Sequence, residues 1–203
     1  MLSRFFLILG LIALLPGCGK KLPPEDSCHF VQNSQLQRVS WKGNFPVEIY
    51  VQDSFPQEYY PDLLSAMAQW DYTLGRTTFK FAGTVSGDNS GGAQDGRSVV
   101  YVMNAWETDK PREQGRTTIY WTGDEITEAD IRINSHDFSF FSGQPAVSGK
   151  VHLESLFVHE LGHVLGLQHN DGEPSVMATT LATAQFREKP LSADHSAIHC
   201  EYN

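Results

Sequence analysis

Residues 159–169 read His159-Glu160-Leu161-Gly162-His163-Val164-Leu165-Gly166-Leu167-Gln168-His169, and they carry the most specific signal in this chain of 203 residues. Positions four apart on an α-helix lie on one face, one turn apart, so His159 and His163 can reach the same metal ion. Gly166 permits a sharp break after the helix, which lets His169 return as a third ligand. Three imidazoles leave the fourth tetrahedral position of a zinc ion to water, which is typical of a catalytic site. Glu160 lies beside His159, where it can hold that water.

The alternative is a set of solvated or core histidines at accidental spacing. The added glycine and third histidine make this alternative rarer by roughly a thousandfold than for the shorter two-histidine pattern alone. The required helix is also expected, because the apolar residues of the segment repeat at helical spacing. The pattern predicts a helix over residues 153–167 with an apolar face made of Leu156, Phe157, Leu161, Val164 and Leu165.

The motif from His159 to His169 resembles the extended zinc signature of the metzincin peptidases. Met177 follows eight residues later, in Ser175-Val176-Met177, and resembles the Met-turn on which these enzymes rest their zinc site. The likeness is greatest to the matrixins, the matrix metalloproteinase group. Three short segments resemble matrixin sequence: Leu156-Phe157-Val158, Leu165-Gly166-Leu167 and Leu191-Ser192-Ala193-Asp194.

The resemblance implies an α+β, metzincin-like zincin fold: a twisted mixed sheet with an active-site helix, a Met-turn and a C-terminal helix. It is specific over roughly residues 151–200 and only architectural before them. It also implies zinc bound by His159, His163 and His169, and Met177 beneath the site. Calcium could bind as well, although the sequence gives no support for it.

The function implied is that of a zinc-dependent endopeptidase acting on extracytoplasmic proteins, with Glu160 as the base that activates the zinc-bound water. The substrate is a protein or peptide lying along an edge strand, which the resemblance places between Ser135 and Val147. One alternative is a weakly active or inactive metzincin scaffold that serves as a binding or adhesion lipoprotein; the intact Glu160 argues against it. Another is a zinc hydrolase dedicated to one partner.

Two departures from matrixin sequence concern specificity and packing. Matrixins carry a Pro and a Tyr after the Met-turn, where this chain has Ala178-Thr179-Thr180-Leu181, so the main specificity pocket is expected to have another shape. His195 replaces the second of two adjacent aspartates in the closing helix. No tyrosine closely follows Met177, so the tyrosine ligand of astacins and serralysins is not expected.

The N-terminus predicts export. Arg4 precedes an apolar run over residues 5–15, which is too short to span a bilayer and is typical of a signal peptide. The run ends in Leu15-Pro16-Gly17-Cys18, which resembles the bacterial lipobox with Pro16 as an unusual member. Residues 1–17 are therefore expected to be a lipoprotein signal peptide, with Cys18 lipidated and the protein held at an outer membrane or cell surface. The alternative is an ordinary secretory signal in which Cys18 is incidental.

Polar residues 18–40 are predicted to be a tether and residues 41–203 the catalytic domain. In an oxidising compartment Cys28 and Cys200 could form a disulfide that closes almost the whole mature chain; the alternative is two free thiols. We expect a monomer. The net charge of −9 argues against a nucleic-acid partner.

The remaining pattern predicts an alternation of strands and helices. Strands are expected at residues 47–51, 77–82, 98–103, 116–122 and 129–134, and a helix at residues 61–74 ending at Gly75. Residues 83–97 and 135–150 are expected to be mainly loop, and residues 192–200 a closing helix with Ser192 as its N-cap.

Several other polar residues are weaker candidates for a site. Asp88, Asn89 and Asp95 could coordinate calcium, but their spacing does not fit an EF-hand and a solvated loop is favoured. His136-Asp137 is a poor metal pair. His152 is expected to contact surface groups, and His195 and His199 to have packing or surface roles.

Overall fold

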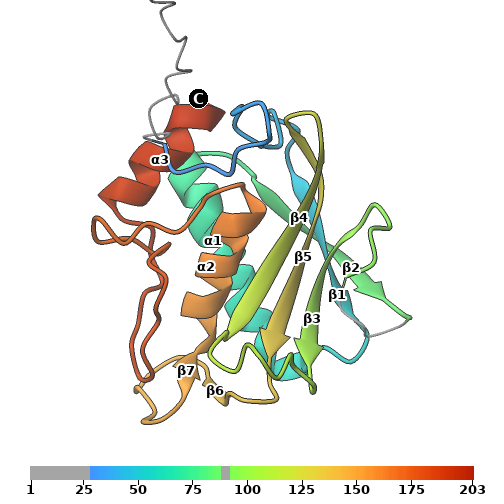
Figure 1. Ribbon diagram of the computed structural model, residues 1–203. Coiled ribbons are helices and arrows are strands. Elements are labelled where there is room, and N and C mark those ends of the chain that lie inside the picture. Colours follow the sequence, from blue (N-terminus) through green and yellow to red (C-terminus); the bar gives the residue numbers. More distant parts are fainter. Residues whose placement is uncertain (1–27, 88–91) are drawn as a thin grey trace, which may run out of the picture.

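The computed structural model describes residues 28–87 and 92–203 (Figure 1). Five strands form one mixed sheet in the order β2-β1-β3-β5-β4. Only β4 is antiparallel, pairing with β5, while the other neighbours are parallel. The strands are β1 (Val47–Gln52), β2 (Phe79–Val85), β3 (Ser98–Met103), β4 (Gly115–Thr122) and β5 (Glu125–Asn134).

Burial of the strands follows their positions in the sheet. Strand β3 is central, and all six of its residues are buried. Strand β4 lies at the edge, where most residues are half-buried. It forms a hairpin with β5 through Gly123, whose φ of +65° suits glycine. The pairing extends β5 back to Glu125, four residues before the predicted start.

Two helices, α1 (Tyr60–Leu74) and α2 (Leu153–Val164), pack side by side on one face of the sheet (Figure 1). A short 3-10 turn, η1 (Gln57–Tyr59), precedes α1, which ends at Gly75 as predicted. The buried indole Nε1 of Trp70 donates to the Val158 carbonyl over 2.9 Å, which fixes α1 against α2. The α+β class is thus confirmed.

Residues 28–40 are part of the domain, so the prediction of a tether up to residue 40 is wrong for them. Phe30 and Val39 are completely buried, and Val31 N–H donates to the Gly166 carbonyl over 2.8 Å. A disulfide joins Cys28 to Cys200, with their Cα atoms 6.0 Å apart. The few apolar residues of this segment fill single gaps in the core and show no periodicity, so the sequence pattern does not indicate that it belongs to the domain. The predictions for residues 1–27, including the signal peptide and Cys18, lie outside the described residues.

The C-terminal part brings smaller differences. A two-stranded parallel ladder, β6 (Phe140–Phe141) with β7 (Val151–His152), precedes α2. The closing helix α3 (Ser192–Tyr202) has Leu191 as its N-cap, not Ser192, because the Asp194 carboxylate accepts the Leu191 N–H over 2.7 Å. In the described part of the chain, every helix falls short of the length and apolarity needed to cross a bilayer.

Candidate metal centre

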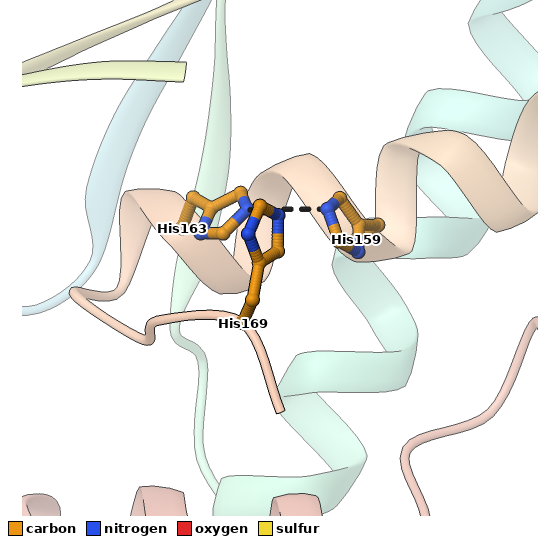
Figure 2. A group of neighbouring side chains, drawn as sticks. All are labelled: His159, His163 and His169. Carbon is orange, nitrogen blue, oxygen red and sulfur yellow. Dashed lines mark hydrogen bonds between the residues drawn. The ribbon is translucent and has the colours of Figure 1, made fainter. Parts of the chain in front are cut away.

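Three imidazoles converge at the middle of the molecule. His159 and His163 project from one face of α2, and His169 enters from the loop that follows the helix (Figure 2). The Nε2 atom of His163 lies 3.1 Å from that of His159 and 3.2 Å from that of His169. Two nitrogen ligands of one tetrahedral zinc ion lie about 3.4 Å apart, which is close to both of these distances.

The reversal of the chain after α2 depends on Gly166. Its φ of +95° lies in the left-handed region, and a Cβ at this position would meet the Val39 carbonyl oxygen at 2.5 Å. Only glycine meets both conditions. The Leu167 N–H then donates back to the Gly162 carbonyl over 3.1 Å, which closes the turn and directs His169 toward the two helical histidines.

The other nitrogen of each helical histidine is held by the backbone. His159 Nδ1 lies 2.8 Å from the Val176 carbonyl oxygen, and His163 Nδ1 lies 2.7 Å from that of Leu167. A carbonyl can only accept, so each Nδ1 carries the proton and each Nε2 presents a lone pair. Two lone pairs 3.1 Å apart repel one another unless a cation lies between them. The residues therefore fit a zinc ion.

Burial keeps these imidazoles neutral, as metal ligation requires. It lowers the pKa of His163 to about 4 and that of His159 well below its usual range. The pKa of His169, which is more exposed, is lowered by the same cause.

Glu160 is buried next to His159 and lines the same cavity as the three histidines. Burial raises its pKa to about 7, although a hydrogen bond from Thr117 Oγ1 to Oε2, 2.7 Å long, opposes the rise. The other oxygen, Oε1, faces Gly115, where a Cβ would approach to 2.6 Å. Strand β4 thus holds this carboxylate, a contact that the spacing of residues in the sequence could not reveal.

Met177 lies beneath the histidines. Its sulfur packs against the backbone of Gly162 so closely that a Cβ there would overlap it. The turn that carries it is held by Asp194 on α3, which accepts from the Ser175 hydroxyl and, over 3.0 Å, from the Val176 N–H. Because the Val176 carbonyl also accepts the hydrogen bond from His159 Nδ1, α3 and the metal centre are linked through one residue.

A cavity of 740 Å³ opens in front of the histidines. One wall is the edge strand β4, so the expectation of an edge strand between Ser135 and Val147 is wrong. That segment includes β6, which pairs with β7 outside the main sheet. The lining also includes Thr179, Thr180 and Leu181 from the altered segment after Met177.

Arg187, which the sequence did not single out, also lines the cavity. Its guanidinium donates to the Thr180 carbonyl over 3.0 Å and to the Ala178 carbonyl over 3.1 Å. It thereby holds the segment from Ala178 to Thr180 that follows Met177. No local pattern marks such a residue, because its partners are backbone atoms chosen by the path of the loop.

The weaker candidates lie elsewhere. Asp88 and Asn89 fall outside the described residues, while Asp95 accepts the Arg97 N–H. His136 Nε2 lies 3.8 Å from Asp137 on the surface. The rings of His195 and His199 are 6.3 Å apart on α3, away from the centre. The surface role expected for His152 is wrong, because its side chain is completely buried.

A mixed sheet with an antiparallel edge strand, a helix bearing two of three converging histidines and a methionine beneath them together define a metallopeptidase class. The Matrixin family model (Peptidase_M10) matches residues 65–203, and the chain belongs to this family of zinc-dependent metallopeptidases. Over 57 residues the chain is 39% identical to Metalloendoproteinase 2-MMP of Arabidopsis thaliana. That match covers 28% of this chain and 15% of the plant protein.

Proposed function

We propose that this chain is a zinc-dependent endopeptidase whose metal is held by His159, His163 and His169 and whose general base is Glu160. The observation that carries the proposal is the convergence of three neutral imidazoles, each with Nε2 turned inward, beside a buried carboxylate in one open cavity. When bound, zinc would polarise the scissile carbonyl and lower the pKa of a coordinated water toward 7.

Glu160 supplies the proton transfers. With a pKa of about 7, its carboxylate is balanced between accepting a proton from the attacking water and returning it to the leaving amine. Thr117 holds one oxygen of the carboxylate, and the glycine at position 115 leaves room for the other. The side chain is therefore positioned before a substrate arrives.

Strand β4 offers the binding surface for an extended peptide. It pairs with β5 on one side only, so the backbone groups of its other edge are available for main-chain hydrogen bonds. Residues 114–117 of this segment line the cavity that contains Glu160. Recognition through the backbone would accept varied sequences, and the wall formed by Thr179, Thr180 and Leu181 would select among side chains.

Replacing Glu160 by Gln tests this mechanism. We expect Glu160→Gln to keep about one zinc at the histidines and to lose activity on casein or a peptide library by roughly 10²–10⁴-fold. The exposed Glu58→Gln serves as the matched control and should cleave like the parent. Cleavage by Glu160→Gln at the parental rate would show that the proton transfers are assigned to the wrong group.

The peptide library also separates the alternatives. Chelator-sensitive cleavage of many sequences supports a general endopeptidase. Zinc binding without any cleavage would indicate a binding or adhesion module, and cleavage of a single cellular protein would indicate a dedicated hydrolase.

We further propose that the protein is exported and anchored to a bacterial membrane through a lipid on Cys18, as a monomer. The Cys28–Cys200 disulfide supports an oxidising compartment. Cys18→Ser should move the protein from the membrane fraction to the soluble extract and abolish incorporation of labelled palmitate. Light scattering of the purified protein measures the oligomeric state.

A further inference from the structure

A second group of metal-ligating side chains lies near the start of α2. Asp62 comes from the first turn of α1, His152 from β7 and Glu154 from the first turn of α2. One donor atom from each lies within 4.8 Å of the other two. The group is separated from the three-histidine centre by roughly 10 Å along the helix.

His152 carries an unpartnered nitrogen into this group. Its side chain is completely buried, and its ring packs against those of Phe141 and Phe186 at centroid distances of 5.0 Å and 4.6 Å. Its Nε2 atom has no hydrogen-bond partner among the described residues. A buried nitrogen without a hydrogen-bond partner is unfavourable, so its place beside carboxylates favours a bound ligand.

The Ser155 hydroxyl contacts the other nitrogen of this imidazole. The Ser155 hydroxyl oxygen lies 2.9 Å from His152 Nδ1 and also accepts the Arg187 N–H over 2.7 Å. A hydroxyl oxygen has two lone pairs, so it can also accept a hydrogen bond from Nδ1–H. In that arrangement Nε2 presents its lone pair to the carboxylates, as a metal ligand would.

The carboxylates are oriented by serines and not by cations. Ser142 Oγ donates to Asp62 over 2.5 Å, and Ser65 Oγ donates to Glu154 over 2.6 Å. A third carboxylate, Glu188, lies with one oxygen 3.7 Å from His152 Nε2. Among the described residues, no lysine or arginine lies within ion-pair distance of Asp62 or Glu154. The group therefore gathers carboxyl groups around one imidazole.

We propose that Asp62, His152 and Glu154 form a second metal site, with Glu188 beside it, for a divalent transition-metal ion such as zinc. One imidazole nitrogen and two or three carboxylate oxygens suit zinc or manganese, whereas calcium takes six to eight oxygen ligands. Ligands on one tetrahedral ion lie about 3.4 Å apart. The donor atoms here lie within 4.8 Å of one another, so small side-chain rotations would bring them to the distance that an ion requires.

Such an ion would join three segments: the start of α1, the start of α2 and residues 186–188. The last of these includes Arg187, whose guanidinium holds the wall of the catalytic cavity. The second site is therefore structural, and it connects the packing of the two helices to the cavity wall.

Zinc stoichiometry tests the site in two backgrounds. Dialysed against zinc, the purified parent should retain about two ions per chain, and Asp62→Asn or Glu154→Gln about one. The double variant His159→Ala/His163→Ala should retain about one ion, and the further change Asp62→Asn should remove it. The exposed Asp109→Asn is the matched control and should change neither number. Circular dichroism verifies that each variant is folded.

Cobalt provides a second readout, because its visible absorption reports the ligands. The double variant loaded with cobalt should give a spectrum that disappears on His152→Gln. If the parent retains only one zinc ion and the double variant retains none, the second site is overturned, while the three-histidine centre remains supported. The measurement in the parent background still decides the matter if the double variant fails to fold.

Discussion

Asp130 on β5 couples the stability of this fold to pH. Its side chain is 1% exposed, and Oδ1 accepts the Val99 N–H over 3.0 Å. Its Oδ2 atom has no partner among the described residues. Burial raises the pKa of Asp130 to about 7; the Val99 hydrogen bond opposes this rise, and the nearby Glu128 and Asp95 add to it. We predict that Asp130→Asn stabilises the protein at pH 8 and has little effect near pH 4.

The size of the effect follows from the two pKa values. The change from 3.8 in the unfolded chain to about 7 in the folded one corresponds to roughly 4 kcal/mol, at about 1.4 kcal/mol per unit. Because the folded pKa is the higher one, the folded state binds the proton more tightly. The contribution of Asp130 is therefore fully present below about pH 4, declines up to about pH 7, and is lost above it. An asparagine does not titrate, so a gain of about 2–4 kcal/mol is expected at pH 8.

Urea unfolding at several pH values between about 4 and 8 measures this linkage. The difference in unfolding free energy between Asp130→Asn and the parent should grow across this range. Asp109→Asn, at an exposed aspartate, is the control and should keep the parental pH dependence. A constant difference between Asp130→Asn and the parent at all pH values would refute the assignment of a raised pKa to this carboxyl.

Three further changes probe the support of the metal centre. Gly166→Ala should destabilise the fold by about 2–4 kcal/mol, through a strained φ and a clash with a backbone carbonyl, and should weaken zinc binding measured by chelator competition. Replacing Cys28 and Cys200 together by Ser should cost up to about 5 kcal/mol in urea unfolding, since the disulfide closes nearly the whole described chain; an unchanged midpoint would contradict this. Asp194→Ala should lower the free energy of unfolding by about 2–4 kcal/mol, because it leaves the Val176 N–H unpaired, and should lower zinc affinity. Unaltered zinc affinity would show that α3 does not support the metal centre.

The features that the sequence predicts well are those set by local geometry. His159 and His163 share a helix face because of the helical period, and Gly166 marks the reversal because few other residues adopt its φ. The helix of residues 61–74 was predicted from its apolar stripe and the glycine that ends it. Each of these inferences depends on residues close together in the chain.

The features that it misses depend on contacts between distant segments. Thr117 acts on Glu160 because β4 lies at the sheet edge beside α2, and the order of strands is not encoded in any one of them. The burial of His152 follows from the packing of Phe141 and Phe186 around it. Likewise, the sequence around Phe30 has no apolar periodicity, yet Phe30 packs next to Gly166 in the turn after α2.

The N-terminal segment is consequently part of the metal centre. The Gly166 carbonyl accepts a hydrogen bond from the Val31 N–H over 2.8 Å, and the Gln168 N–H donates to the His29 carbonyl over 2.7 Å. These two bonds hold the chain on both sides of the turn that delivers His169, the most exposed of the three proposed ligands. The segment itself is fastened at Cys28. Reduction of the disulfide should therefore weaken zinc binding through the third histidine first, while His159 and His163 keep their places on α2.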